Sequence, residues 1–349
     1  MEIPHKQSAL LIPAKQAPMV IGTVDVYKPE VGEALVRIEA TGLSPADWKI
    51  HEWGIGITEF PTILGGPAAG VVVQLGEGVS NLVLGDRILF QGSRKSSRVG
   101  TFQQYAVTPA ALAVKVPANL TSDEAATLPS AVGTAFNGLY GAYASDDVRS
   151  GAGLTPFWKG QYTNQPFVVL SGATSTGQLA IQFAKLSGFS PIIVTASLQN
   201  TKLLKSLGAT HVVDRSLPSN DLATEIKKIA RAPMKYIYEA VGIPEVQQFG
   251  YDLLAPGGTL IDVMYAAPDL KQVDNKRIAW THGGFDYPLF AELASEFLPR
   301  LPELLEKGVI KPNIPEYIPG GLAVIPEGLA RLKNARVSAR KLVVHPGDT

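Results

Sequence analysis

Residues 167–177 read Phe-Val-Val-Leu-Ser-Gly-Ala-Thr-Ser-Thr-Gly, and this stretch decides the fold. Its first four residues are an apolar run of the kind that forms a buried parallel strand. The small residues that follow suit a turn in which backbone N–H groups and a helix N-terminus face a pyrophosphate. Gly172 and Gly177 take the first and third positions of G-x-G-x-x-G, and Thr174 takes the middle one. Alone, this incomplete glycine pattern fits an ordinary strand–turn–helix equally well.

Strands and helices alternate regularly after this stretch. We predict strands at 167–170, 191–196, 211–214, 236–240 and 259–264, and helices at 177–187, 200–207, 221–231 and 244–254. This spacing is typical of βαβ units and a parallel sheet. The alternation therefore favours a phosphate-binding turn, in which the cofactor contacts are Gly172, Ala173, Thr174, Ser175, Thr176 and Gly177.

The first part of the chain has a different character. Across residues 8–115, short apolar stretches are separated by glycine and proline turns, as in a small barrel-like domain. Thr121 to Glu124 then place a cap and early acids before a helical stretch. Residues 143–166 form a polar connector, interpreted as either a disordered insertion or a functional loop. A chain of 349 residues with these segments is expected to form two domains.

The composition excludes several classes of function. Lys plus Arg and Asp plus Glu both number 31, so the net charge is zero and neither nucleic acid nor an anionic membrane is an expected partner. No apolar run reaches the roughly 18 residues of a membrane span, and the cytosol is the expected location. The absence of cysteine excludes disulfides, thiolate nucleophiles and Cys-ligated zinc.

The residues after the second predicted strand indicate which nucleotide binds. In NAD-specific sites an acid about 20 residues beyond the turn holds the ribose 2′-hydroxyl. Here that place is taken by Ser197, followed by Asn200 and Lys202, which can donate hydrogen bonds to a 2′-phosphate. This pattern favours NADPH. The alternatives are helix caps for Ser197 and Asn200 and a solvated surface position for Lys202.

Further short motifs resemble those of a known superfamily over nearly the whole chain. They lie at 42–47, 64–72, 84–87, 101–105, 128–129, 134–135, 207–214 and 256–258. With them the chain resembles the medium-chain dehydrogenase/reductase superfamily, and residues 47–49, 186–191 and 337–343 resemble its zinc-independent fungal enoyl reductases. The resemblance implies an α/β fold in which a doubly wound Rossmann domain (132–284) is inserted into a GroES-like, β-barrel-type catalytic domain (1–131 and 285–349).

The same comparison implies chemistry without a metal. Ser44 stands where zinc-dependent relatives carry a Cys ligand, and Gly66-Pro67 stands where they carry His-Glu. The five histidines are scattered without metal-ligand spacing, so no metal is expected. Without a Lewis acid to polarise an alkoxide, an α,β-unsaturated carbonyl is the acceptor that suits hydride transfer.

The resemblance also implies candidate catalytic residues. Lys49 matches a substrate-side lysine of the fungal enoyl reductases, the alternative being a surface cation on a turn. Thr134 matches a threonine near the nicotinamide, or else bonds back to its own helix. Ser44 and Pro45 belong to a loop that faces the nicotinamide in relatives. Tyr265 directly follows the fifth strand, where ligands gather, unless its role is packing.

Other candidates would contact the cofactor. Ala240, Val241 and Met264 lie at the carboxyl ends of the fourth and fifth strands. Gly283 and Gly284 resemble a loop that approaches the nicotinamide from the far side, or form a simple turn. Lys341, in the last strand, reaches the cofactor phosphates or lies on the surface.

The sequence therefore predicts an NADPH-dependent ene-reductase that adds hydride to the β-carbon of a small enone, enal or enoyl substrate. One alternative is a trans-acting enoyl reductase that serves a carrier domain of a polyketide synthase. Others are a quinone or carbonyl reductase and, least favoured, a non-catalytic NADPH-binding protein. A monomer and a homodimer are both compatible with the sequence.

Overall fold

The computed structural model describes residues 2–93, 96–145, 148–267, 269–271 and 275–349. Its contacts divide the chain into two compact units. Unit 1 comprises Met1–Ser130 and Glu296–Thr349, and unit 2 comprises Ala131–Ser295. Within the described ranges, every helix is too short or too polar to cross a membrane.

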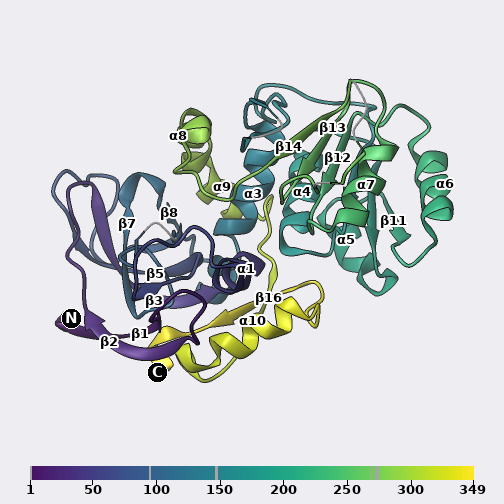
Figure 1. Ribbon diagram of the computed structural model, residues 1–349. Helices are drawn as coiled ribbons and strands as arrows, with labels where there is room; N and C mark the ends of the chain where they lie inside the picture. Colours follow the sequence, from purple (N-terminus) through teal and green to yellow (C-terminus); the bar gives the residue numbers. More distant parts are fainter. Residues whose placement is uncertain (1, 94–95, 146–147, 268, 272–274) are drawn as a thin grey trace. The chain divides into compact units, whose positions relative to one another are not determined.

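Unit 2 is built on a six-stranded parallel sheet in the order β11-β10-β9-β12-β13-β14 (Figure 1). The strands are β9 (Phe167–Leu170), β10 (Ile192–Ala196), β11 (His211–Asp214), β12 (Tyr236–Glu239), β13 (Thr259–Asp262) and β14 (Arg277–Trp280). The strand order reverses between β9 and β12, and this switch point is where ligands bind in open α/β sheets. The first five strands were predicted, whereas β14 was missed because no helix separates it from β13.

Helices cover both faces of this sheet, as in a doubly wound fold. They are α3 (Pro129–Tyr140), α4 (Ser175–Leu186), α5 (Thr201–Leu207), α6 (Ser219–Ala230) and α7 (Pro244–Leu253). On one face, α6 and α7 bury Ile226 and Tyr251 against Ile193 and Leu260 of the strands. On the other, α3 lies so close that a Cβ on Gly138 would meet Ile261 at 2.8 Å.

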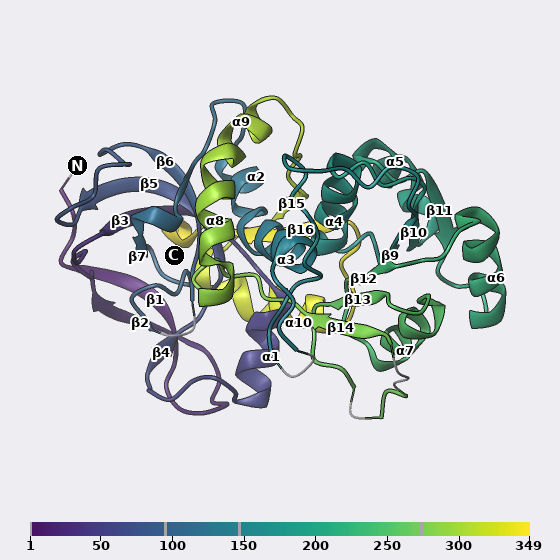
Figure 2. The same cartoon turned by 90° about the horizontal axis from the view of Figure 1, so that it is seen from above.

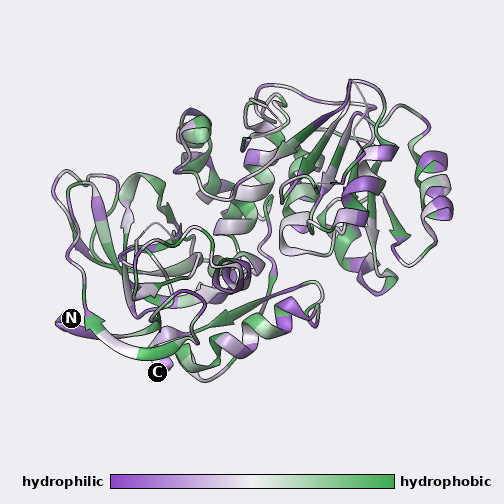
Figure 3. Cartoon of the chain, in the orientation of Figure 1, coloured by the Kyte–Doolittle hydropathy of each residue, from purple (hydrophilic) through white to green (hydrophobic). Residues whose placement is uncertain are grey.

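The figures show how the helices of unit 2 are placed. In two views α6 lies beside β11, at the end of the sheet (Figure 1, Figure 2). The strands of the sheet are coloured mainly as hydrophobic, whereas α6 alternates between hydrophilic and hydrophobic turns (Figure 3). This is the pattern expected of strands buried on both faces and of an amphipathic helix that covers them.

The connector of residues 143–166 packs on unit 2 through aromatic side chains. Phe157 lies against Tyr140 and Trp158 stacks on Phe136, while Tyr162 stacks on Phe189 at 4.7 Å between ring centroids. The N–H of Tyr162 also donates to the carbonyl of Ser187 at 2.7 Å. The prediction of a disordered insertion is therefore wrong for the described part of this segment, because burial of large rings orders it.

Unit 1 contains two sheets. The larger has the order β15-β16-β3-β5-β6-β8, with β7 also paired to β3, and the smaller has the order β2-β1-β4. The strands are β1 (Lys6–Ile12), β2 (Val20–Asp25), β3 (Glu33–Gly42), β4 (Thr62–Ile63), β5 (Pro67–Leu75), β6 (Arg87–Gln91), β7 (Tyr105–Pro109), β8 (Val114–Lys115), β15 (Ile314–Tyr317) and β16 (Arg340–Val344). The apolar stretches predicted within residues 8–115 are thus strands of these two sheets.

The helices of unit 1 are α1 (Pro45–Trp53), α2 (Ser122–Ala126), α9 (Leu301–Glu306) and α10 (Ile325–Lys333), and α8 (Ala291–Phe297) crosses the boundary between the units. The predicted cap of α2 is present: Thr121 Oγ1 accepts from Glu124 N at 3.2 Å, and Glu124 Oε2 accepts from Thr121 N at 2.9 Å. This reciprocal pair is a capping box.

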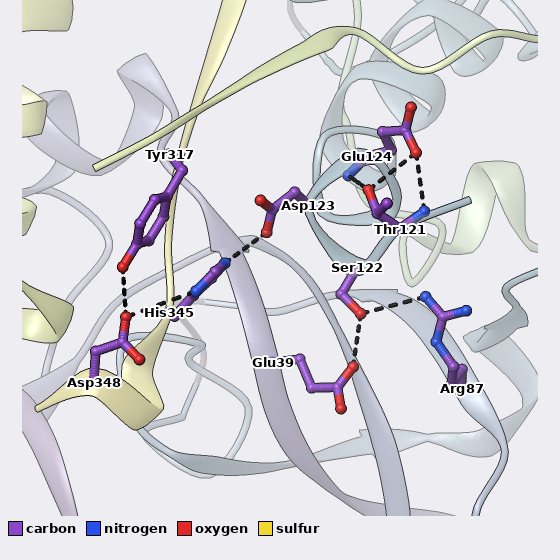
Figure 4. A network of polar contacts seen from close by, with 9 residues as sticks. All are labelled: Glu39, Arg87, Thr121, Ser122, Asp123, Glu124, Tyr317, His345 and Asp348. Atoms are coloured by element: carbon purple, nitrogen blue, oxygen red, sulfur yellow. Dashed lines mark hydrogen bonds and ion pairs between the residues drawn. The ribbon is translucent and has the colours of Figure 1, made fainter. Parts of the chain in front are cut away.

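A polar network joins distant parts of unit 1 around α2 (Figure 4). Nε2 of His345 and Oδ1 of Asp123 are 2.6 Å apart, and the Tyr317 hydroxyl donates to Asp348 at 2.6 Å. On the other side of α2, Ser122 donates to Glu39 at 2.6 Å. These bonds tie the end of the chain to α2, and α2 to β3, so both chain segments of unit 1 meet at this helix.

The second boundary between the units differs from the sequence-based division. The sequence predicts that residues 285–349 belong to the catalytic domain, whereas the contacts keep 285–295 in unit 2. The physical reason is aromatic packing on α3, since the Phe285 ring lies 6.1 Å from that of Phe136. A Cβ on Gly141 would also meet the Phe290 ring at 2.5 Å.

Candidate functional site

The glycine turn after β9 is shaped by close backbone packing. A Cβ on Gly172 would lie 2.1 Å from Cγ1 of Val194, and a Cβ on Gly177 would lie 2.7 Å from Cα of Gly172. The N–H groups of Ser171 and Gly172 donate to Oγ1 and to the carbonyl of Thr195, both at 3.0 Å. Only glycine fits at positions 172 and 177, because any side chain there would push the turn away from β10.

The turn leads into the N-terminus of α4. Thr174 caps this helix, since its Oγ1 accepts from Gly177 N at 3.0 Å, and the helix therefore begins at Ser175, two residues earlier than predicted. Ser175 and Thr176 lie in the first turn, where backbone N–H groups have no acceptor within the helix. Ala173 is held by Gln178, whose amide donates to its carbonyl at 3.1 Å. These donors and the helix dipole suit an anion.

The carboxyl edge of β10 and β11 carries the groups considered for a 2′-phosphate. Ser197 and Asn200 occupy the N-cap positions of the 3-10 turn Leu198–Asn200 and of α5, and neither side chain makes a capping hydrogen bond there. Lys202 is exposed on α5. Sequence reasoning missed Arg215, which directly follows β11 and whose N–H donates to the carbonyl of Ala196 at 3.1 Å. The pairing of Ala196 with Asp214 places Arg215 next to Ser197, a relationship that only the strand register reveals.

Two loops follow β12 and β13 at the same edge, and they carry the candidates Ala240, Val241, Met264 and Tyr265. Each is tied to a buried acid at the end of its strand. Glu239 accepts from Val241 N at 2.9 Å, and Asp262 accepts from Met264 N at 2.8 Å. The latter bond turns the chain, which explains why β13 ends two residues before the predicted end. The Tyr265 side chain is 57% exposed and its ring lies against that of Trp280.

The loop with Gly283 and Gly284 is fastened to α3. Nδ2 of Asn137 donates to the carbonyls of His282 and Gly284, at 2.8 and 3.2 Å. A Cβ on Gly133 would lie 1.9 Å from the carbonyl oxygen of Gly283, so the two backbones touch. This close contact is made with α3, and the approach of the loop to the nicotinamide stays a prediction.

Thr134 lies on the same helix. Its carbonyl accepts from the Tyr238 hydroxyl at 3.0 Å and from Oγ1 of Thr281 at 3.1 Å. These two bonds anchor the middle of α3 to β12 and to the residue after β14. The half-buried Thr134 is therefore held rigidly beside the loop of Gly283.

The remaining candidates lie in unit 1. Ser44 and Asp47 are buried at the start of α1, and Oδ2 of Asp47 accepts from Ser44 N at 2.8 Å. Lys341 is only 4% exposed, and its ammonium donates to Oγ of Ser44 at 2.8 Å. The alternative of a surface position for Lys341 is therefore wrong, because its place in β16 turns it inward against Gly42. Pro45, by contrast, is exposed.

Burial shifts the pKa of both charged groups of this cluster, Asp47 and Lys341. It raises the pKa of Asp47 to about 6, although the N–H of Ser44 and the Lys341 ammonium oppose the change. Burial also lowers the pKa of Lys341 to about 8, which the charge of Asp47 opposes. A buried ammonium bonded to a serine hydroxyl can stabilise negative charge or pass a proton.

Lys49 lies on α1 rather than on a turn, since this part of the barrel-like segment is helical. The expectation of a turn failed because Pro45 begins a helix that Gly54 ends with a positive φ of 60°. The Lys49 ammonium lies over two indole rings, 5.8 Å from the centroid of Trp48 and 5.6 Å from that of Trp53. These cation–π contacts restrain a side chain that would otherwise move freely.

The residues of unit 2 fit a dinucleotide on structural grounds. A tightly packed glycine turn, a helix N-terminus and the loops at the carboxyl edge of the sheet are the features such a cofactor requires. Within the described ranges there is no group of three or more His, Cys, Asp or Glu residues with the geometry to hold a metal ion.

Two protein families match the chain. The family described as alcohol dehydrogenase GroES-like domain matches residues 30–118, within unit 1. The family described as zinc-binding dehydrogenase matches residues 175–282, within unit 2. The chain is also 30% identical to a trans-enoyl reductase of Aspergillus sclerotiorum, over 89% of this chain and 92% of that one. It is 32% identical to a trans-enoyl reductase of Gibberella zeae, over 88% of each chain.

Solved structures share the fold over almost the full length. An alcohol dehydrogenase superfamily protein from Novosphingobium aromaticivorans has a TM-score of 0.77 at 23% identity, covering 97% of this chain and 99% of that one. The JamJ enoyl reductase has a TM-score of 0.75 at 21% identity, with the same coverage. The chain therefore belongs to the medium-chain dehydrogenase/reductase superfamily of oxidoreductases and, within it, to the family of the fungal trans-enoyl reductases.

Proposed function

We propose that the protein is an NADPH-dependent enoyl reductase that reduces the C=C bond of an α,β-unsaturated carbonyl compound. The observation that carries the proposal is the glycine turn at the switch point, where Gly172 and Gly177 let the chain pack closely and lead into the N-terminus of α4, a site suited to a pyrophosphate. Membership of the trans-enoyl reductase family supports this choice of reaction.

The preference for NADPH rests on the carboxyl edge of β10 and β11. Ser197 takes the place of the acid that would repel a 2′-phosphate. Arg215 and the exposed Lys202 add positive charge to this edge. Asp214 is directed elsewhere, because its Oδ1 accepts from both the N–H and the hydroxyl of Ser216. An arginine pairs well with phosphate oxygens.

The residues of the chain would assist the reaction by position and charge. When bound, the cofactor supplies the hydride for the β-carbon of the substrate. We assign to the Lys49 ammonium the stabilisation of the negative charge that gathers on the carbonyl oxygen. Thr134 would position the nicotinamide, and Ser44 would contact the substrate through its hydroxyl. The exposed phenol of Tyr265 is our candidate donor of the proton that reaches the α-carbon.

A second candidate differs only in how the substrate is delivered. The similar proteins from Aspergillus sclerotiorum and Gibberella zeae are named trans-enoyl reductases, and the similarity spans 88% or more of both chains. An acyl chain held on the carrier domain of a polyketide synthase is therefore the alternative substrate.

Product analysis with deuterated NADPH tests both candidates. The protein is given a free enone and, separately, the same acyl group as a pantetheine thioester on a carrier protein. Deuterium at the β-carbon of a saturated product supports the proposed reaction, and turnover of the carrier-bound substrate alone favours the second candidate. Turnover of quinones with no reduction of either unsaturated substrate would contradict both.

A further inference from the structure

Two acids lie side by side in the interior of unit 2, at the carboxyl ends of adjacent strands. Glu239 ends β12 and Asp262 ends β13, and the parallel register pairs them directly. Both are fully buried, at 0% exposure. Because side chains alternate along a strand, Glu239 shares the face of Ile237 and Asp262 that of Leu260, which is the face covered by α7.

The two acids hold the loops that follow their strands. Glu239 accepts from the N–H groups of Val241 and Gly242 through its two oxygens, at 2.9 and 2.6 Å. Oδ1 of Asp262 accepts from Met264 N at 2.8 Å. The buried amide of Gln247, on α7, donates to the carbonyl of Tyr265 at 2.8 Å and accepts from Ala267 N at 2.9 Å. Three buried side chains thus set the shape of both loops.

The hydrogen bonds of the two carboxyl groups leave a place for one proton between them. Both oxygens of Glu239 are engaged as acceptors, whereas Oδ2 of Asp262 is buried with no hydrogen-bond partner in the described part of the chain. Burial, and then the charge of Glu239, raise the pKa of Asp262 well above its usual range. Adjacent buried carboxyls resist ionising together, because the second negative charge would be desolvated and would be repelled by the first.

In the described part of the chain, no cation is among the groups that act on the pKa of Asp262. The groups that affect the pKa of Asp262, among the described residues, are Glu239, the N–H of Met264 and the amide of Gln247. Tyr238 alternates to the other face, where its hydroxyl donates to the carbonyl of Thr134 at 3.0 Å. Trp280 is the register partner of Asp262 on β14, and the Arg149 guanidinium lies 5.0 Å from the centroid of its ring.

We propose that Glu239 and Asp262 share one proton at neutral pH, and that this proton holds the loops 240–242 and 263–267 in the form that binds the cofactor. The inference rests on the proposed function, since it assigns the cofactor to this edge of the sheet. Glu239 and Asp262 are positioning residues, because they act through the loops. Loss of the proton in alkaline solution places two negative charges together and releases both loops.

The test is the affinity for NADPH, measured by fluorescence titration between about pH 7 and about pH 9.5. The Kd of the unmodified protein is expected to rise about tenfold over this range. In Asp262→Asn, the amide oxygen still accepts from Met264 N and the amide N–H₂ donates to Glu239 at every pH, so the Kd stays level. In Glu239→Gln, the amide N–H₂ meets an N–H of Val241 or Gly242, so binding is weak throughout.

A matched control is Asp252→Asn on α7, where an exposed carboxylate accepts from Gln248 at 2.8 Å. This variant is expected to follow the unmodified protein at every pH. Infrared spectroscopy gives a second readout that needs no cofactor: a carboxylic-acid C=O band in the unmodified protein at neutral pH, absent from Asp262→Asn.

The outcomes separate the inference from the proposed function. A Kd that changes equally with pH in the unmodified protein and in Asp262→Asn overturns the inference, as does the absence of the infrared band. No binding of NADPH at any pH, with the band present, overturns the proposed cofactor while leaving the shared proton established.

Discussion

The ammonium of Lys341 donates to the hydroxyl of Ser44 across 2.8 Å, although 297 positions separate the two residues in the chain. The bond joins the last strand of the protein to the start of α1. Asp47, one turn into that helix, holds the N–H of Ser44 from the other side. Ser44 is therefore held between a buried cation and a buried acid.

Removal of the cation alone should destabilise unit 1. In Lys341→Met, Asp47 keeps its burial but loses the one positive charge among the described residues that favours its ionised form. We expect a loss of about 3 kcal/mol in the free energy of unfolding at neutral pH, as for a buried charge left unpaired. The double variant Lys341→Met/Asp47→Asn should recover most of the lost free energy. Urea unfolding measures the stability of the single and the double variant. The control Lys307→Met breaks an exposed ion pair with Glu303 and should change little.

The same cluster predicts a dependence of stability on pH. The pKa of Asp47 is raised to about 6, so its contribution is present in acid and is lost as the pH rises toward that value. The pKa of Lys341 is lowered to about 8, so its contribution is present in alkali and is lost as the pH falls through that value. The unfolding free energy of the unmodified protein, relative to the double variant, should therefore be lowest between these two values. A maximum there would contradict the assignment.

Lys49 should affect turnover more than folding. We expect Lys49→Met to lower kcat roughly 100-fold, because a donor to the developing charge is lost. Lys333→Met is the matched control, since that ammonium also lies over Trp48, at 5.9 Å, and pairs with Glu52. Steady-state kinetics with an enone measures kcat for both variants. Equal effects of the two substitutions would show that the indole contact matters and the proposed charge stabilisation does not.

Arg215 should decide between the two nicotinamide cofactors. We expect Arg215→Ala to raise the KM for NADPH about tenfold and to leave the KM for NADH nearly unchanged, since only NADPH carries the 2′-phosphate. Lys202→Ala should act in the same direction, whereas Lys205→Ala, at another exposed position on α5, should not. A loss of affinity for both cofactors would indicate that Arg215 contacts the adenosine or stabilises the fold.

Local sequence patterns were sufficient where the structural cause is also local. Thr121 to Glu124 predicted the capped start of α2, and the glycines at 172 and 177 predicted the turn after β9. Sequence patterns failed where the packing partner of a residue lies far away along the chain. The connector of residues 143–166 reads as polar, yet Tyr162 is ordered by Phe189. The helix of Lys49 was hidden in a segment otherwise rich in strands.

The paired acids illustrate the same limit. Each of Glu239 and Asp262 ends a short apolar strand, which is a visible signal for a residue at a carboxyl edge. Nothing in the sequence says that the two face each other, because the register of β12 against β13 is a property of the assembled sheet.

The sequence by itself determined the alternation of strands and helices, the glycine turn and the lack of an acid at Ser197, since each depends on residue types at short spacing. Only the tertiary structure decided which side chains meet. It buried Lys341 against Ser44, placed Arg215 beside Ser197 and set Glu239 against Asp262. Sheet order and register bring these residues together, and they arise from the packing of the whole chain.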